Sequence, residues 1–460
     1  MNVSLVSPPT TVFDRYPKDH PLRRGFQVTE PLGLGYLASN IQDLSGVKIV
    51  DCIAENLSSD ECVSRVKESD LIGISVVDNN AEISKRLAQK IKEVNPNAII
   101  VFGGIHPSLY PDEVLSNKDV DIVVIGEGEH TLREIVSNVP LEKVSGIVFR
   151  KDGKLVKTEP RPLERNLDIF HFPARYLIPM EKYHPFLYLK NPVHSLISSR
   201  GCPFTCIYCC RDISGQTYRV RSVEKVIEEI KYLVSGRAWR SREIDFQDPL
   251  FGLNEKWLRA FCNAMIREKI DVVWSALTRV NVVNEDLLRL MKRAGCWMLY
   301  YGIEAGTQHL LDNIKKRTTL DMVKKSVELT SRVGIKTWGS FMFALPGETP
   351  ESASETLRFA KSLPLDFASF HLTTPFKGTE LEKEHWKWGR MNSDLLEDFT
   401  QLNPVFIPFG WEGKEEQLKQ FFIKAFRGFY LRPRYILRQL SKTRSFDEVK
   451  MYFRGLKVVI

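Results

Sequence analysis

The chain has 460 residues, of which 43% are hydrophobic and 27% charged, and its formal net charge is +8. This length and apolar content suit a large globular protein that divides into two or three domains. No run approaches the roughly eighteen uninterrupted apolar residues of a membrane span, and Met1–Pro9 lacks the basic-then-apolar order of a signal peptide.

Short apolar strands alternate with helical stretches in the N-terminal part of the chain. Such runs are typical of strands that are buried on both faces of a parallel sheet. The pattern therefore predicts a doubly wound, Rossmann-like α/β domain whose ligand lies beyond the carboxyl ends of the strands. The expected strands are Ile49–Ile53, Leu71–Val76, Ala98–Gly104 and Val120–Gly126, and the expected crossover helices are Ala81–Val94 and Thr131–Val139.

Glycine-rich turns follow two of these strands. One contains Gly103, Gly104 and His106, and the other contains Gly126, Glu127 and Gly128. Glycine lets a backbone approach a ligand closely, so these turns are candidate binding loops. Taken alone they are equally well explained as tight connections between a strand and a helix.

A proline-rich stretch separates the first domain from the rest of the chain. Lys151–Lys154 has the sequence of a hairpin turn, and six prolines between 160 and 192 disfavour long regular elements. The expected divisions are an α/β domain at 1–145, a linker at 146–192, a barrel at 193–383 and a helical, basic domain at 384–460.

Strand and helix signals then repeat at intervals that suit βα units. They predict a full or partial barrel whose active site lies at the carboxyl ends of its strands, with Arg221–Ser235 as a helix capped by Ser222. The expected strands are His194–Ser199, Glu243–Gln247, Val272–Ala276, Met298–Ile303, Lys336–Phe343 and Phe367–Leu372.

Three cysteines in a Cys-x3-Cys-x2-Cys run follow the first of these strands. Cys202, Cys206 and Cys209 can hold three irons of a [4Fe–4S] cube and leave the fourth iron open. A structural zinc site is disfavoured because no second pair of ligands follows, and a disulfide is disfavoured because the other cysteines are scattered in apolar or helical contexts. Cys210 directly follows the triplet and is an alternative ligand.

The segment from Cys202 to Cys209 resembles the signature of the radical S-adenosylmethionine (SAM) enzymes, with Tyr208 at its usual aromatic position. The resemblance implies that SAM chelates the open iron. It also implies that an external reductant such as flavodoxin or ferredoxin supplies an electron to the cluster. That electron then cleaves SAM to give a 5′-deoxyadenosyl radical. An oxygen-sensitive cluster and unpaired cysteines predict a cytoplasmic protein.

Polar residues at the strand ends stand where SAM needs them in that family. By resemblance, Asp248 helps to place the methionyl amino group, Arg279 lies near the SAM carboxylate and Glu304 faces the ribose hydroxyls, with Tyr208 beside them. A zwitterion needs an anion and a cation nearby, which supports this assignment independently. The alternative for each residue is a solvated charge or a structural ion pair.

The N-terminal turns, together with Pro31–Ala38, resemble the cobalamin-binding domain that precedes the barrel in one branch of these enzymes. The resemblance implies cobalamin contacts from the glycine turns, Glu127 and His106. The Asp-x-His-x-x-Gly motif is absent, since no histidine stands two residues after Asp51. We therefore expect cobalt without a protein histidine below it, or a domain that has kept the fold and lost the vitamin.

The C-terminal region is strongly basic. From Lys424 onward it holds ten lysines and arginines and two acids, a difference that equals the net charge of the whole chain. Such a tail can attract an anionic partner, and Leu431–Arg438 interleaves apolar with basic residues, which predicts a hydrophobic or anionic lipid-like substrate, or one delivered by peripheral membrane contact. The alternative is a solvated helix whose aromatics Phe422, Phe426 and Phe429 pack onto the barrel.

These expectations combine into a cobalamin-dependent radical SAM enzyme that methylates an unactivated carbon of a small-molecule or lipid-like substrate. The alternative within the branch is a cyclase or carbon–carbon bond-forming enzyme. Methylthiolation is disfavoured because Cys52 and Cys62 are too few for an extra cluster. An Fe–S or cobalamin sensor that binds nucleic acid is a remote alternative, since no nucleic-acid-reading motif is present.

Overall fold

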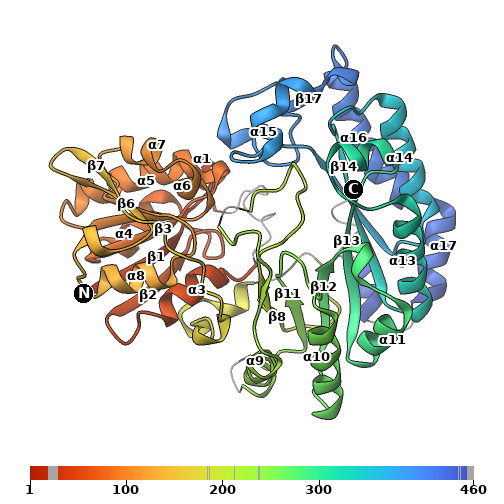
Figure 1. Cartoon of the computed structure of the whole chain (residues 1–460), viewed down its shortest axis with the longest axis horizontal. Coiled ribbons are helices and arrows are strands. Elements are labelled where there is room, and N and C mark those ends of the chain that lie inside the picture. Colours follow the sequence, from red (N-terminus) through yellow and green to blue (C-terminus); the bar gives the residue numbers. More distant parts are fainter. Residues whose placement is uncertain are drawn as a thin grey trace. The chain divides into compact units, whose positions relative to one another are not determined.

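The structure is a computed structural model that describes residues 1–18, 29–183, 185, 187–211, 213–236, 239–443, 445 and 447–452. The chain forms two compact units, drawn in Figure 1 with colours that follow the sequence. The N-terminal unit consists of Met1–Pro185 with Arg211–Arg219, and the barrel unit consists of Phe186–Cys210 with Val220–Ile460. The four domain limits expected from the sequence, 1–145, 146–192, 193–383 and 384–460, stay a prediction.

The N-terminal unit is built on a seven-stranded sheet with helices on its faces. Its first five strands in spatial order are parallel, and its last two are antiparallel additions. That order is β2 (Gly46–Asp51), β1 (Asn2–Ser7), β3 (Leu71–Ser75), β4 (Ile99–Gly103), β5 (Ile122–Val124), β6 (Ile147–Lys151) and β7 (Lys154–Lys157). The helices are α1 (Thr11–Arg15), α3 (Leu32–Ser39), α4 (Ser59–Val66), α5 (Ala81–Val94), α6 (Ile105–Leu109), α7 (Pro111–Ser116) and α8 (Glu129–Val136).

Most of these elements follow from the apolar runs, and α5 has the predicted bounds. The hairpin expected at Lys151–Lys154 is present, with Asp152 at φ +49° and Gly153 at φ +76° in its turn. Its strands extend the first sheet, although they lie in the range expected as a linker. Sequence reasoning missed β1, because serines interrupt its short apolar run and its side chains are buried only by neighbouring strands.

The barrel unit contains an open sheet of six parallel strands, as expected. Its spatial order is β8 (Val193–Leu196), β11 (Glu243–Phe246), β12 (Val273–Thr278), β13 (Cys296–Glu304), β14 (Lys336–Phe343) and β15 (Phe367–Leu372). The other short strands are β9 (Ser199–Arg200), β10 (Arg219–Val220), β16 (Gly389–Met391) and β17 (Phe406–Pro408). The sheet is thus a partial barrel rather than a closed one.

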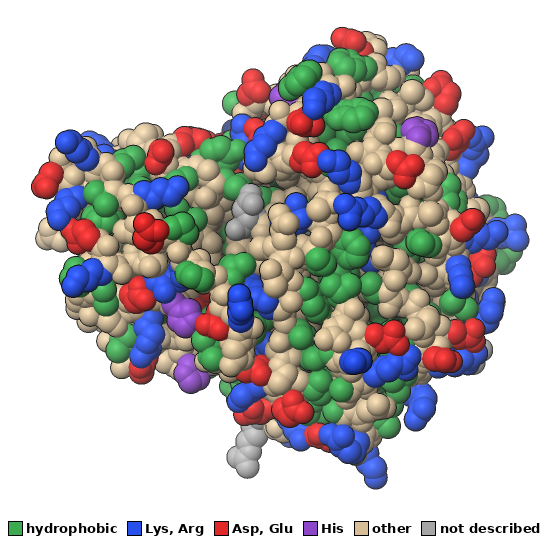
Figure 2. Space-filling model, viewed as in Figure 1, with side chains coloured by type: hydrophobic (Ala, Val, Ile, Leu, Met, Phe, Trp, Pro, Cys, Tyr) green, Lys and Arg blue, Asp and Glu red, His purple; other side chains and the backbone are tan. Residues whose placement is uncertain are grey.

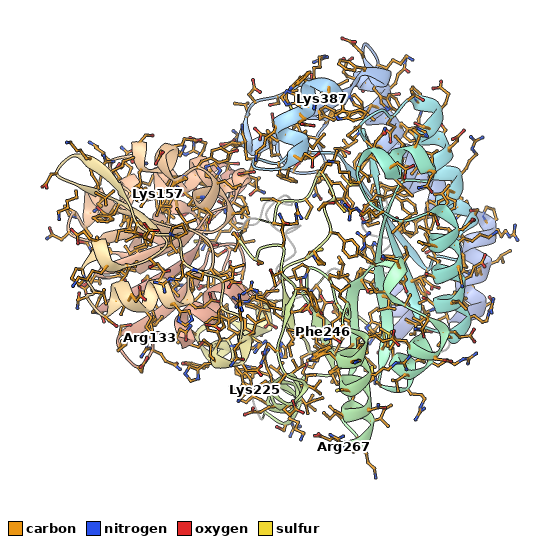
Figure 3. The ribbon with its side chains drawn as sticks, in the orientation of Figure 1. Arg133, Lys157, Lys225, Phe246, Arg267 and Lys387 are labelled. Atoms are coloured by element: carbon orange, nitrogen blue, oxygen red, sulfur yellow. The ribbon has the colours of Figure 1, made fainter. Side chains whose placement is uncertain are left out.

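Helices cover the outer face of this sheet (Figure 1). They are α9 (Val223–Ser235), α10 (Glu255–Arg267), α11 (Glu285–Arg293), α13 (Leu320–Val333), α14 (Pro350–Ser362), α16 (Glu415–Tyr430) and α17 (Pro433–Lys442). Two shorter helices, α12 (Gln308–Asn313) and α15 (Glu380–Glu384), instead pack in a separate cluster that includes Ile207. Ser222 caps α9 as predicted, because its side chain accepts a hydrogen bond from Lys225 N. Phe246, labelled in Figure 3, contacts Phe251, Phe261 and Trp274 in the core between sheet and helices.

The C-terminal helices belong to the same core. Phe422 and Phe429 are buried in it and Phe426 packs against it, so the packing alternative for these aromatics is confirmed. Within the described ranges, no helix combines the length and the apolar character needed to cross a membrane. On the face shown in Figure 2, side chains of both charges are interspersed. The basic residues Arg444, Arg454 and Lys457 lie outside the described residues.

Candidate active site

The cysteine loop is anchored to the carboxyl end of the barrel sheet by the residue between two of its cysteines. The backbone N–H of Ile207 donates to Ile314 O at 3.2 Å, and its carbonyl accepts from Leu381 N at 2.9 Å. The Ile207 side chain is buried in an apolar cluster with Ala305 and Leu345, which flank the ends of two strands. This anchoring holds Cys206 and Tyr208 over the mouth of the barrel.

None of the three cysteines of the run forms a disulfide. Cys206 is buried, Cys202 is half-buried and Cys209 is exposed. Among the described side chains no three carboxylate, imidazole or thiol groups converge on one point that could hold a single ion. A cube does not need such convergence, because each thiolate binds a different iron. The donor set therefore fits a [4Fe–4S] cluster with one open iron.

Arg279 connects the third strand end of the expected series to this loop. Its Nη1 lies 3.7 Å from Cys206 Sγ, and its guanidinium stacks 3.7 Å from the ring centroid of Phe204. Nη2 also donates to Lys316 O. Arg279 therefore places a fixed cation beside the cysteine loop.

Glu304, Lys316 and Tyr208 form a triad at the end of β13. Lys316 Nζ lies 2.6 Å from Glu304 Oε1, the Tyr208 hydroxyl donates to the same oxygen at 3.0 Å, and Lys316 Nζ lies 3.2 Å from that hydroxyl. The Glu304 and Lys316 side chains are only 9% and 6% exposed. Burial, with the Glu304 carboxylate beside it, holds the pKa of the Tyr208 hydroxyl well above its ordinary value.

The backbone at Glu304 is unusual. Its φ of +70° lies in the left-handed region, and the pairing with β14 shifts register between Gly302 and Glu304. A non-glycine residue in this region costs free energy and persists only where the surrounding structure enforces it, often at a functional site. The shift turns the Glu304 carboxylate toward Tyr208 and Lys316.

Asp248, at the end of β11, holds the start of the cysteine loop. It accepts hydrogen bonds from Ser198 N at 2.7 Å, from the Ser198 hydroxyl, and from the Ser199 hydroxyl at 2.7 Å. Burial raises the pKa of Asp248, and the hydrogen bonds from Ser198 and Ser199 oppose the rise. In this structure Asp248 positions the chain three residues before Cys202.

The inner face of the barrel sheet, opposite to the helix-covered face, carries a buried carboxylate. Asp245 accepts from Ser275 Oγ at 2.8 Å and from Gln247 Nε2 at 2.6 Å. Leu277, two residues beyond Ser275 on the same face, is 44% exposed. Since a large apolar side chain on the inside of a barrel is normally covered, the sheet is open at this level.

Two aromatic rings and a histidine lie on the inner face of the strands β13, β14 and β15. The rings of Tyr300 and Trp338 are 5.2 Å apart between centroids. Trp338 Nε1 donates to Ser369 Oγ at 3.0 Å, and His371 Nε2 lies 3.1 Å from that oxygen. Burial lowers the pKa of His371, and the Glu304 carboxylate opposes this effect. A neutral His371 can then accept the Ser369 proton on Nε2 and present a donor at Nδ1.

The N-terminal unit contains a pocket of about 350 Å³ at the carboxyl edge of its sheet. Gly126 and Glu127, directly after β5, line it together with Ser108 and Lys157, the latter labelled in Figure 3. Arg219 donates to both Glu127 oxygens, at 2.7 and 2.9 Å, which fixes the carboxylate on the pocket wall. Its size is at the lower end of the range for small-molecule sites.

The other predicted cobalamin contacts do not line this pocket. Gly104, at φ +108°, is required by the turn, because a Cβ there would lie 2.6 Å from Val76 O. His106 is 1% exposed and its Nδ1 is 2.8 Å from Asp78 Oδ1. Gly103 and Gly128 are likewise part of the strand-to-helix turns. Close backbone packing accounts for the turn at Gly104, whereas the turn at Gly126 faces open space.

Sequence reasoning missed Lys316, which completes the Glu304 site. Lys316 stands in a run of basic residues after α12, and such runs are normally solvated. The only available signal was that a buried strand-end glutamate needs a cation. It also missed the inner-face group of Asp245, Tyr300 and His371, which becomes visible only once the strand register is known.

Two family models match the chain. A B12-binding domain matches residues 25–136, and the radical SAM superfamily matches residues 196–360. An uncharacterized methyltransferase, PH0819, of Pyrococcus horikoshii is 33% identical over 99% of this chain and 98% of its own length. The chain therefore belongs to the radical SAM enzymes that carry a cobalamin-binding domain.

More distant relatives span the same two domains. An anaerobic magnesium-protoporphyrin IX monomethyl ester cyclase of Rubrivivax gelatinosus is 28% identical over 92% of this chain and 77% of its own length. A solved structure of the radical SAM methyltransferase TsrM of Kitasatospora setae, with cobalamin and a [4Fe–4S] cluster bound, has a TM-score of 0.68 at 18% identity and covers 92% of this chain and 81% of that chain. That likeness shows the shared fold.

These findings confirm the predicted fold class and the radical SAM enzyme class, with SAM, a [4Fe–4S] cluster and cobalamin as the cofactors of the family. A small-molecule substrate and an external reductant belong to the chemistry of this superfamily. The relatives include a named methyltransferase and a cyclase, so both reactions expected from the sequence occur among them.

Proposed function

We propose that this enzyme methylates an unactivated carbon of a small-molecule substrate. Cobalamin supplies the methyl group in such chemistry, and the reduced cluster supplies the electron that cleaves SAM to the 5′-deoxyadenosyl radical. The observation that carries the proposal is that one chain combines two sites. The barrel holds a cysteine loop beside Arg279 and the buried triad of Glu304, Lys316 and Tyr208, and the cobalamin-type domain has a ligand-sized pocket at its sheet edge.

Each polar group at the barrel mouth has a role in this proposal. Cys202, Cys206 and Cys209 bind three irons, and Arg279, whose Nη1 lies 3.7 Å from Cys206 Sγ, offers its charge to the SAM carboxylate. Glu304 accepts from the ribose hydroxyls of SAM while Lys316 and Tyr208 hold its position. Asp248 helps to place the methionyl amino group of SAM by fixing the start of the cysteine loop through Ser198.

The reaction is tested with SAM that carries a deuterated methyl group. Anaerobic holoenzyme, a chemical reductant and a metabolite extract from cells that lack the enzyme are incubated together, and new products are identified by mass spectrometry. Methylation predicts a product that gains the deuterated methyl group and 5′-deoxyadenosine formation that depends on the extract. A product that has lost hydrogen and carries no deuterium would instead establish the cyclase alternative, which the cyclase relative supports.

We propose that the pocket at Gly126 and Glu127 receives part of the cobalamin. The pocket lies beyond the carboxyl ends of β4 and β5, where ligands of doubly wound sheets bind. Its wall combines backbone groups at Gly126, the fixed Glu127 carboxylate and apolar side chains such as Leu109 and Phe170. Gly103, Gly104, His106 and Gly128 remain predicted contacts that this pocket does not support.

Filling the pocket at Gly126 is expected to weaken cobalamin binding at least about tenfold. Gly126 has φ +80° and no atom within 4 Å of the position of a Cβ, so Gly126→Leu projects a side chain into open space. Gly153→Leu is the matched control, because Gly153 has φ +76°, equally open surroundings and no place in the pocket. Both variants should lose similar stability, of the order of 1–3 kcal/mol.

Absorbance titration of the cluster-loaded protein with hydroxocobalamin distinguishes the two variants. Equal affinity of Gly126→Leu and Gly153→Leu would mean that cobalamin does not use this pocket. Failure of the unaltered protein to bind any corrinoid would remove methyl transfer from the proposal and leave a domain that has kept only the fold.

The cobalt of the bound cofactor is expected to have no protein histidine below it. Asp51 is not followed by the histidine of the usual motif, and His106 is buried with its Nδ1 held by Asp78. Electron paramagnetic resonance of the Co(II) state should therefore be the same whether the protein carries ¹⁴N- or ¹⁵N-labelled histidine. A change of the superhyperfine splitting on labelling would contradict this prediction.

We propose further that the substrate is hydrophobic, with a lipid-like body. Tyr300, Trp338 and the exposed Leu277 provide apolar surface on the inner face of the barrel. The buried Asp245 on the same face disfavours an anionic group at that point. Peripheral contact with a membrane surface through the C-terminal region is the matching proposal for how such a substrate is delivered.

A further inference from the structure

Three polar side chains of helix α17 point toward the protein. Arg438 donates to Leu365 O at 3.2 Å and to Pro364 O, and Lys442 Nζ lies 3.4 Å from Asp366 Oδ1. Gln439, only 6% exposed, points to Asp366 O at 3.5 Å. These contacts satisfy the backbone carbonyls and the buried carboxylate of the connection between α14 and β15.

The outward face of the same helix is aliphatic. Leu437 and Leu440 are each 67% exposed, and Ile436 is 43% exposed. An amphipathic helix on a globular protein normally buries its apolar face, so α17 has the reverse orientation. We call these three side chains the aliphatic ridge.

The chain that carries the ridge is basic. Arg434 of α17 and Lys424 and Arg427 of α16 are exposed, and no acidic residue occurs between Glu416 and Asp447. Arg432, Arg438 and Lys442 do not add to this surface, because their side chains bond to carbonyls or to Asp366. Some basic side chains of the tail expected from the sequence therefore bond to the protein itself, and others are exposed to solvent.

We propose that the aliphatic ridge docks the enzyme onto an anionic lipid bilayer. Interfacial helices that bind such surfaces combine buried aliphatic side chains with flanking lysines and arginines. Protein interfaces are anchored by aromatic side chains, whereas the aromatic residues Phe426, Tyr430 and Tyr435 of these helices pack against the core. This docking is independent of the proposed methyl transfer and refines the proposed membrane contact to one face of α17.

The test is co-sedimentation of the full-length holoenzyme with vesicles. Vesicles of phosphatidylcholine with phosphatidylserine should bind the protein more tightly than vesicles of phosphatidylcholine alone, and high salt should weaken the binding. Leu437→Gln/Leu440→Gln is expected to reduce the affinity at least about tenfold, and Arg434→Gln about fivefold. Circular dichroism and SAM cleavage show whether each variant is folded.

Val94→Gln/Leu155→Gln is the matched control. Both residues are exposed aliphatics, at 56% and 40%, and belong to the other unit, so their replacement should leave vesicle binding unchanged. Absence of binding to anionic vesicles, equal binding to neutral ones, or unaltered binding of the ridge variant would overturn the proposal. A dimer that dissociates in the ridge variant, without vesicle binding, would assign the ridge to a second copy of the chain instead. No outcome depends on methyl transfer, so the two proposals fail separately.

Discussion

Replacement of Cys202, Cys206 or Cys209 by alanine is expected to remove the cluster and with it all SAM cleavage. In the proposed cluster each of the three thiolates would hold a different iron of the cube, and the open iron that SAM requires would exist only with three protein ligands in place. Iron and sulfide analysis after anaerobic reconstitution should fall from about four irons per chain to near zero in each variant.

Cys210→Ala is the matched control for this prediction. Cys210 is the next residue after Cys209, and it too forms no disulfide. The variant should keep its iron, its sulfide and its ability to form 5′-deoxyadenosine. A cluster that survives in any of the three alanine variants, or that is lost in Cys210→Ala, would show that the ligands have been assigned incorrectly.

Replacement of Lys316 by methionine is expected to destabilise the barrel unit by about 3–5 kcal/mol. The change leaves the Glu304 carboxylate buried without its cation, and the penalty of an unpaired buried charge exceeds the worth of the pair itself. The variant should also bind SAM poorly, because Glu304 is no longer held against Tyr208. The double variant Glu304→Gln/Lys316→Met should recover much of the stability but none of the SAM binding.

The neighbouring Lys315 supplies the control. Lys315 pairs with Glu380 at 2.5 Å, but the two side chains are 51% and 41% exposed, so Lys315→Met should change stability by at most about 1 kcal/mol. All eight tryptophans lie in the barrel unit, so denaturation followed by tryptophan fluorescence reports that unit alone. Equal shifts for Lys315→Met and Lys316→Met would contradict the role assigned to the buried pair.

The cluster loop and the order of the two domains were predictable because their signals are local. Cys202, Cys206 and Cys209 lie within eight consecutive positions, and the spacing of three cysteines over so short a segment does not depend on the tertiary fold. The strands β14 and β15 and the helix α5 have their predicted bounds, since each is a continuous run with one dominant period. Glu304, Asp248 and Arg279 were singled out by their positions after strands.

The partners of those residues were not predictable. Tyr208 meets Glu304 across 96 positions, and Arg219 meets Glu127 across 92. A sequence indicates that a buried charge needs a partner but not which of many lysines or arginines will supply it. The tertiary fold also decided that Asp248 secures the serines before the cysteine loop.

Helix α17 shows the same division most clearly. The sequence by itself determined that apolar and basic residues interleave over Leu431–Arg438. Only the tertiary structure decided which face turns inward. The connection before β15 contains backbone carbonyls and the buried Asp366, and these acceptors must be paired with hydrogen-bond donors. Arg438 and Lys442 supply those donors, so the basic side chains face inward. The sequence thus determined the chemistry of the protein's parts, and the fold determined which parts meet.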